Sequence, residues 1–351
     1  MRKSKKLTTL PIAGAFIGTV VGAGFATGQE VFQFFTVFGW YSFIAIFLTS
    51  ILFSFFGMTI MKLSRKIHVR SHLDLVKSIA GRKLGLFLDW IITLSFFGVL
   101  VVMAAGAGAI AKEQLGLPPF IGSLFILLLT FCVVLSGLDN VIRAIGLVVP
   151  FLLLSVLGVA LYSIIANPII PQKIQFLSSL TPSTAPNWYY SSILYVSYNI
   201  FLSVAILSSL GVMAKDTTSL TRGALLGGLG LGIGLLAINL ALVSGLPQIL
   251  DYEVPMIYLA SFFSPLLALS YGVILLLEIF TTTVSILFGL VVRLATTSTQ
   301  RFFWAMTASL CALLASQIGF SKVVLMIYPV MGYVGVILLL CLLGALRKTH
   351  K

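Results

Sequence analysis

The 351-residue chain has little charge, little histidine and little cysteine for its length. Only 9% of its residues are charged, with nine Asp and Glu, three His and three Cys. Hydrophobic residues make up 59% of the chain instead, and the mean hydropathy is +1.13. Apolar runs of about 20 residues, the length that crosses a bilayer, recur throughout. The composition therefore predicts an all-α polytopic membrane protein without a soluble domain.

Few side chains are available for catalysis or for disulfides. Cys132, Cys311 and Cys341 are odd in number and fall inside apolar runs, so we expect buried small residues and no disulfide framework. The three histidines fall in polar segments, and the chain has no HExxH, GxSxG, P-loop or CxxC pattern. The sequence therefore favours a protein that is not an enzyme and has no resident cofactor.

Basic residues are concentrated in one set of connections between the apolar runs. Ten spans are predicted near residues 8–37, 40–62, 84–111, 119–137, 142–166, 188–212, 219–244, 263–291, 302–319 and 323–346. With the N-terminus inside, the cytoplasmic set includes Arg2, Lys3, Lys5 and Arg143. Only Lys112, Lys173 and Lys322 of the 22 Lys and Arg residues then fall outside. This asymmetry follows the positive-inside rule. It predicts a multi-pass cell-membrane protein with both termini in the cytoplasm, and it gives no reason to expect a nucleic-acid partner.

The spacing of the spans indicates an internal repeat. Residues 8–166 and 188–346 each hold five spans in about the same length. Because five is odd, the second half enters the membrane inverted. Inverted repeats place substrate and ion sites at their interface, on corresponding broken helices. We therefore expect one transport domain over residues 1–351, a 5+5 inverted repeat with broken first and sixth helices.

One stretch of the first span is unlike an ordinary membrane helix: Gly18-Thr19-Val20-Val21-Gly22-Ala23-Gly24-Phe25-Ala26-Thr27-Gly28-Gln29-Glu30. Glycine weakens a helix by roughly 1 kcal/mol relative to alanine, and freed backbone groups survive in lipid only where they line a cavity or are buried in protein. The stretch predicts a broken helix whose amides face an anionic substrate group and whose carbonyls face a cation. The substrate contacts predicted there are Gly22, Ala23, Gly24 and Thr27. The alternative is close helix packing through glycines four residues apart, at Gly14, Gly18 and Gly22.

The segment Gly18-Thr19-Val20-Val21-Gly22-Ala23-Gly24 resembles the unwound first helix of the LeuT-type fold, which neurotransmitter–sodium symporters share with the amino acid–polyamine–organocation superfamily. The fuller string through Glu30 resembles the YkvI-type bacterial membrane proteins. This resemblance implies alternating-access transport, with substrate held between the first, third, sixth and eighth helices. It also implies a sodium site, at which Gly18 and Val21 offer carbonyls and Thr281 and Thr282 offer hydroxyls. The alternative for the hydroxyls is a bond back to the carbonyl one turn earlier.

Two carboxylates, Glu30 and Glu278, fall well inside apolar spans. A charge at a helix centre costs roughly 2.5–3.5 kcal/mol, so an intramembrane carboxylate usually faces a pathway or a partner. Protonation of either residue is the alternative to sodium as the means of coupling. Glu30 can instead act as a gate residue at the outer mouth.

Further substrate contacts are predicted at Tyr195, Tyr198 and Asn199 of the sixth span, with Gly106 of the third span giving room. The alternative for the tyrosines is an interfacial aromatic belt, which suits the deeper Tyr198 poorly. An asparagine at that depth needs a polar partner.

Together these features predict an ion-coupled secondary transporter of a small organic solute, an amino acid or an amine, embedded in the lipid bilayer, with Na⁺ as the candidate coupling ion. The alternative is a membrane sensor, similar to a germinant-receptor subunit, that binds the solute without moving it. An ion channel is least favoured, because the chain has no repeated carbonyl filter sequence and no charged ring.

Overall fold

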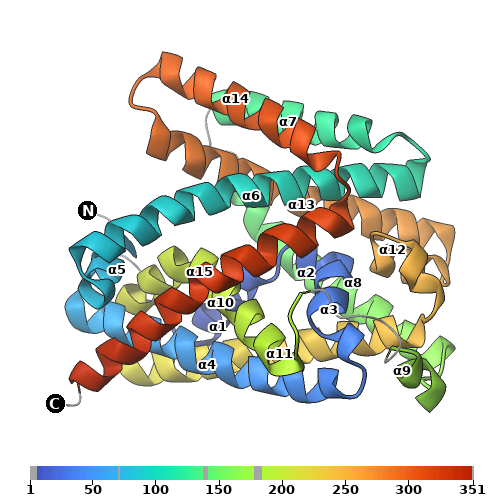
Figure 1. Ribbon diagram of the computed structural model, residues 1–351, viewed down its shortest axis with the longest axis horizontal. Helices are drawn as coiled ribbons and strands as arrows, with labels where there is room; N and C mark the ends of the chain where they lie inside the picture. The colour runs from blue at the N-terminus through green and yellow to red at the C-terminus, as the bar shows by residue number, and fades with distance from the viewer. Residues whose placement is uncertain (1–5, 70–71, 137–140, 178–183, 350–351) are drawn as a thin grey trace.

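The structure, a computed structural model, describes residues 6–69, 72–136, 141–177 and 184–349, without the side chains of residues 72, 136, 141–150, 348 and 349. The side chains of Arg2, Lys3, Lys5 and Arg143, assigned above to the cytoplasmic side, lie outside this description. The described chain is a bundle of helices (Figure 1). Their bounds are α1 Thr9–Val20, α2 Ala23–Thr27, α3 Gln29–Phe34, η1 Thr36–Phe38, α4 Tyr41–Ile67, α5 His72–Ala80, α6 Arg82–Leu115, α7 Pro119–Ser136, α8 Val141–Ala166, α9 Pro171–Leu177, α10 Trp188–Met213, α11 Thr217–Ser244, η2 Gln248–Asp251, α12 Pro255–Ser261, α13 Pro265–Leu294, α14 Ser298–Ser316 and α15 Phe320–Thr349.

Helices occupy all ten predicted span ranges. Within the described residues, six of them are long and apolar enough to cross a membrane, namely α4, α6, α10, α11, α13 and α15. A seventh span results if the bent pair Phe151–Ala166 and Pro171–Leu177 is counted as one. α1 and the segment Pro119–Leu135 of α7 are shorter apolar helices. The protein is therefore an all-helical membrane protein with several spanning helices.

The first predicted span is broken, and it is broken twice. α1 ends at Val20, the linker residues Val21 and Gly22 are extended, and α2 begins one residue later. Gly28 then ends α2 with a left-handed φ of +81°, and α3 starts directly after it. Glycine adopts this conformation at no steric cost, since it has no Cβ. The prediction of a broken first helix is confirmed, and the second break at Gly28 is a feature that the sequence analysis missed.

The prediction of a broken sixth helix is wrong. α10 is one continuous helix of 26 residues. It has no glycine or proline before Gly211, so nothing in the sequence favours a break. Its polar side chains instead bond neighbouring helices. The Ser191 hydroxyl donates to the Phe34 carbonyl at 2.6 Å, and the Ser197 hydroxyl donates to the Gly332 carbonyl at 2.7 Å. These two serines therefore serve packing between helices.

Close packing through glycine is found on α11 rather than on the open face of α1. A Cβ built at Gly227 would lie 2.5 Å from Cδ1 of Phe16 on α1, and one at Gly232 would lie 2.6 Å from Cβ of Ser50 on α4. By contrast, a Cβ at Gly14 or Gly22 would meet no described atom within 4 Å. The small residues of α11 thus bring three helices together, whereas those two glycines of α1 border open space.

The two ends of the bundle carry different parts of the chain. Both termini lie at one end, and α9 and α12 lie at the other (Figure 1). At the terminal end, the Arg293 guanidinium of α13 lies 3.0 Å from the Asp89 carboxylate of α6.

The three cysteines are free, and Cys132 and Cys311 are exposed, which corrects the expectation that they are buried. Both lie on helices that turn part of their surface away from the bundle.

Candidate functional site

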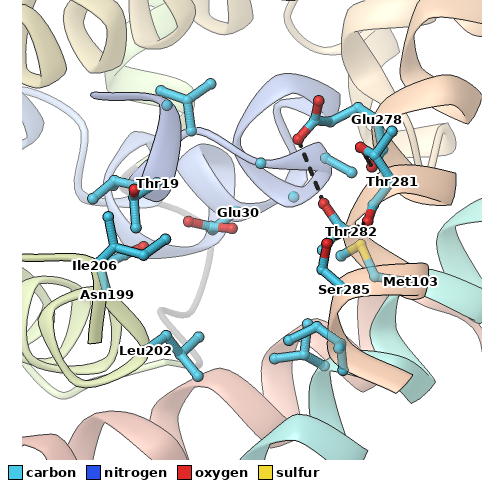
Figure 2. Close-up of a pocket in the computed structure, with 18 of the residues that line it drawn as sticks. Thr19, Glu30, Met103, Asn199, Leu202, Ile206, Glu278, Thr281, Thr282 and Ser285 are labelled. Carbon is cyan, nitrogen blue, oxygen red and sulfur yellow. Dashed lines mark hydrogen bonds between the residues drawn. The ribbon is translucent and has the colours of Figure 1, made fainter. Parts of the chain in front are cut away.

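A cavity of about 820 Å³ lies beside the break between α1 and α2. Its walls come mainly from α1, α6, α10 and α13, and Figure 2 shows side chains from these elements converging on it. The lining residues on each long helix recur about every three or four positions, as single residues or adjacent pairs, so each helix presents one face to the cavity. These residues include Phe96, Val99 and Met103 of α6, Tyr198, Asn199, Leu202 and Ile206 of α10, and Glu278, Thr281, Thr282 and Ser285 of α13.

The cavity extends from the break toward the end of the bundle at which α1 begins. Pro11 and Gly14 line it in the first turns of α1. Ile206 and Ile286 line it in the second halves of α10 and α13. The open space is therefore on the α1 side of the broken span, and the α3 side is filled by protein.

Hydrogen bonds hold the α3 side shut. The Gln33 side-chain amide donates to the Ser321 carbonyl of α15 at 2.9 Å, and the Thr184 hydroxyl donates to the Gln33 carbonyl at 2.9 Å. One turn further, the Thr36 hydroxyl donates to the side-chain oxygen of Asn239 at 2.8 Å. The short helices of the broken span are thus fixed to α11, to α15 and to the segment before α10.

Two carboxylates, those of Glu113 and Glu253, bind backbone amides at the closed end of the bundle. Glu113, near the end of α6, accepts the backbone amides of Glu253 and Val254 at 2.6 and 3.2 Å. The Glu253 carboxylate in turn accepts the backbone amide of Phe320 at 2.8 Å, at the start of α15. A carboxylate is favoured at a helix N-terminus, where amides lack partners within the helix. The acidic connection before α12 therefore ties α6 to α15 across this end.

Glu30 stands where the broken span, α10 and α15 meet. The Tyr198 hydroxyl donates to Oε1 of Glu30, and Tyr328 stacks on Tyr198 with ring centroids 4.8 Å apart. A Cβ built at Gly24 would collide with Oε2 of Glu30, so the carboxylate lies directly over this glycine. The left-handed turn at Gly28 redirects the chain, so that the Glu30 side chain lies beside Gly24 at the start of α2. Glu30 is 4% exposed and points into the cavity (Figure 2).

Glu278 lies on the α13 wall of the same cavity and is 5% exposed. The Thr282 hydroxyl donates to its Oε1 at 3.4 Å, which is the dashed bond in Figure 2. Its Oε2 is buried and has no hydrogen-bond partner within the described part of the chain. Among the described residues that line the cavity there are two carboxylates and no Lys, Arg or His. The cavity is therefore an acidic site with one unsatisfied carboxylate oxygen.

The four residues predicted for a sodium site, Gly18, Val21, Thr281 and Thr282, all line the cavity. The Val21 amide donates to the Ile17 carbonyl at 2.8 Å, and because α1 ends at Val20, the carbonyls that follow Ile17 have no further amide of this helix to accept. The Thr281 hydroxyl donates to the Glu278 carbonyl at 3.0 Å, which is the back-bonded alternative. A donating hydroxyl keeps its lone pairs, so this bond is compatible with cation binding. Oxygen donors of this kind suit a hard cation.

The predicted substrate contacts divide into two groups. Gly22, Ala23, Gly24, Tyr198 and Asn199 line the cavity, whereas Thr27, Gly106 and Tyr195 do not. The Thr27 hydroxyl bonds the Gly24 carbonyl at 2.8 Å within its own short helix. A Cβ at Gly106 would lie 3.2 Å from the Phe320 ring, so this glycine serves helix packing. Tyr195 is fully buried against the rings of Phe34, Phe35 and Phe53.

The residues predicted from the sequence do not include several that line the cavity. Tyr328, Met103, Phe96, Thr19 and Ser285 all line the cavity. Tyr328 carried a readable signal, because it is a polar aromatic residue beside Pro329 deep in an apolar span. Tyr328 stacks on Tyr198, whose depth in its own span also predicts a place at the site.

The arrangement is that of the LeuT-type fold. The crystal structure of MhsT in complex with L-phenylalanine matches with a TM-score of 0.61 at 16% identity, covering 95% of this chain and 88% of that one. A substrate-bound, outward-open Na⁺-coupled sialic acid symporter matches with a TM-score of 0.57 at 13% identity, covering 93% and 76%. The inward-facing conformation of Mhp1 matches with a TM-score of 0.53 at 14% identity, covering 91% and 76%. At these identities the likeness shows the fold alone. These structures are of transport proteins and not of enzymes.

The chain belongs to the family of the membrane protein YkvI of Bacillus subtilis (strain 168), an uncharacterised protein to which it is 31% identical over 336 residues. The alignment covers 95% of this chain and 94% of YkvI. The uncharacterised protein YyaD of the same strain is 30% identical over 330 residues, covering 93% of this chain and 94% of YyaD. No family model matches the chain.

Proposed function

We propose that the protein is an ion-coupled secondary transporter that moves a small organic solute, an amino acid or an amine, by alternating access. The observation that carries the proposal is the cavity at the broken first span, open toward one end of the bundle and closed at the other. A transporter of this fold binds its substrate beside unwound backbone near the middle of the membrane. MhsT, whose fold is similar, holds an amino acid.

The finer architecture is part of the proposal. The ten helical ranges form a 5+5 inverted repeat, and both termini lie in the cytoplasm, where the positive-inside rule puts most of the basic residues. The cavity then opens to the cytoplasm, and the end with α3 and α12 faces outward. With this orientation, the cavity corresponds to an inward-open state. The Mhp1 structure of similar fold is also inward-facing.

Na⁺ is the proposed coupling ion, held by the carbonyls of Gly18 and Val21 and the hydroxyls of Thr281 and Thr282. All four residues line the cavity, and α1 ends at Val20, between Gly18 and Val21. Glu30 is the proposed gate residue, because it lies between the cavity and the closed end with Tyr198 bonded to it. If coupling is by protons instead, Glu30 and Glu278 are the groups that carry them.

The proposal is tested by flux in proteoliposomes. A panel of radiolabelled amino acids and amines is offered with an inward Na⁺ gradient, with K⁺ in its place, and with a pH gradient alone. Accumulation that depends on an ion gradient supports the transporter. Saturable binding of a solute without accumulation would overturn it and favour the sensor.

Gly22→Leu is the informative variant. A Cβ built at Gly22 meets no described atom within 4 Å, and Gly22 lines the cavity, so we expect the leucine side chain to occupy part of the open space. We expect flux to fall to the background while the protein still folds. Gly158→Leu on α8 is the matched control, since this glycine is also uncrowded but is exposed and away from the cavity lining. Equal flux in both variants would contradict the assignment of the cavity.

Thr282→Ala tests the ion. Loss of the hydroxyl removes one proposed ligand. The apparent affinity for Na⁺ should then fall about tenfold or more, since an unreplaced ligand of a buried charge contributes at least about 1.4 kcal/mol. The apparent Na⁺ affinity is read from the initial uptake rate. An unchanged Na⁺ dependence, together with dependence on pH, would move the coupling to the carboxylates.

A further inference from the structure

The cavity holds a buried carboxylate oxygen that nothing in the described chain satisfies. Glu278 is 5% exposed, and its Oε2 has no hydrogen-bond partner, while the other oxygen receives only the long bond of 3.4 Å from Thr282. Buried charges in proteins are normally paired or hydrogen-bonded, because an unpaired one is costly. Since Glu278 lines the open cavity, a group that enters the cavity can supply the missing partner.

The other charged group of the cavity does not supply that partner. Glu30 is also a carboxylate, and it already accepts the hydroxyl of Tyr198. The described lining residues include no Lys, Arg or His. A solute carboxylate would therefore meet two acidic groups and no basic side chain. Positive charge on the solute satisfies Glu278, whereas negative charge adds to the repulsion.

The rest of the wall is apolar. Phe96 and Met103 of α6 and Leu202 and Ile206 of α10 face the same space. Its volume of about 820 Å³ is within the range of sites that hold drug-sized ligands. Such a wall favours a solute with a hydrophobic body, because burial of apolar surface contributes roughly 25 cal/mol per Å².

We propose that the solute is an amphipathic organic amine, whose ammonium group pairs with the Glu278 carboxylate and whose apolar body lies against α6 and α10. This inference rests on the proposed function, since it names the substrate class of the same cavity. It assigns Glu278 to substrate binding and leaves Glu30 at the gate. The choice between the amine and the amino acid is made by the charges of the wall.

Three probes of the same body and different charge test it. They are 2-phenylethylamine, L-phenylalanine and 3-phenylpropionate, which carry net charges of about +1, 0 and −1 at pH 7, as reference pKa values dictate. Each is titrated against the purified full chain, and the dissociation constant is obtained from the shift of the thermal unfolding midpoint. We expect the amine to bind most tightly and the acid most weakly.

Variants assign the preference to the residue. In Glu278→Gln, which keeps shape and removes charge, the amine should bind at least about tenfold more weakly, with little change for L-phenylalanine. Glu278→Asp keeps the charge and should retain the order of the three probes. Asp251→Asn is the control, because it removes one exposed acidic group away from the cavity lining. The unliganded unfolding midpoint of each variant shows that it is folded.

The proposal is overturned if the acid or L-phenylalanine binds more tightly than the amine, if none of the probes binds, or if Glu278→Gln keeps the preference for the amine. The proposed function has a separate readout. An amine that binds through Glu278 but is not accumulated in proteoliposomes would refute transport and leave this inference intact. Ion-driven uptake of a solute with no amine preference would do the reverse.

Discussion

The second break of the first span, at Gly28, gives the sharpest prediction about stability. Gly28 has φ +81° and ψ −16°. A Cβ there would lie 2.8 Å from Cγ of Met256 and 3.2 Å from Cδ2 of Leu242. Gly28→Ala therefore meets two separate obstacles, an unfavourable backbone conformation and a crowded side.

The two contributions have different sizes. A left-handed conformation costs an L-residue about 1–2 kcal/mol, of which about 0.4–1 kcal/mol is offset because alanine restricts the unfolded chain. Overpacking adds about 1–3 kcal/mol. The Met256 side chain is flexible and can move aside, which places the packing contribution toward the lower part of that range. The expected total is a loss of about 1–3 kcal/mol in unfolding free energy.

Gly116→Ala is the matched control. Gly116 ends α6 with φ +66° and ψ +14°, and a Cβ there would meet no described atom within 4 Å. It carries the backbone penalty alone, so we expect a loss of about 1 kcal/mol or less. Unfolding of both variants and the parent in one detergent, followed by circular dichroism, measures the difference. Equal losses would refute the crowding at Gly28, and no loss in either would refute the left-handed conformation.

Two further predictions concern bonds between helices. Asn239 is fully buried and joins the Thr36 hydroxyl to the Ser42 hydroxyl, at 2.8 and 3.0 Å. Asn239→Ala removes both bonds and leaves Thr36 only its long bond of 3.4 Å to the Val31 carbonyl, so it should cost about 2–3 kcal/mol in thermal unfolding; a loss below about 1 kcal/mol would contradict this bridge. The ion pair between Arg293 and Asp89 is about a quarter exposed on each side, so a double-mutant cycle with Arg293→Gln and Asp89→Asn should show a coupling of only about 0.5–1 kcal/mol that shrinks in high salt. A coupling that does not depend on salt would contradict the partial exposure of the pair.

The helices of this protein could be predicted from the sequence because lipid imposes a length and a composition on each of them. The run from residue 84 to 111 is apolar for one bilayer thickness, and α6 occupies it. The break near Gly22 was also readable, since glycines in a span have a backbone consequence. The continuous sixth helix could not be predicted in the same way. The break expected there rests on symmetry with the first span, and no glycine or proline before Gly211 favours it.

The site was predictable only where a residue type has one use in a membrane. Glu30 and Glu278 were found because a carboxylate in a span needs a cavity or a partner. Tyr195 and Tyr198 could not be separated, since they are three positions apart on one helix and only the neighbouring helices decide which faces the cavity. Tyr198 meets Glu30, whereas Tyr195 meets three phenylalanine rings.

Because the native cysteines do not line the cavity, a cysteine introduced there can be labelled selectively. None of Cys132, Cys311 and Cys341 is among the described residues that line it. A thiol reacts as its thiolate, which forms in contact with water. A single cysteine placed at Thr19 or Ser285 would line the cavity and react there, whereas the three native cysteines lie elsewhere. A charged reagent that cannot cross lipid would then modify such a cysteine from one face of the membrane only. The natural chain thus provides a low-background scaffold for determining which face that is.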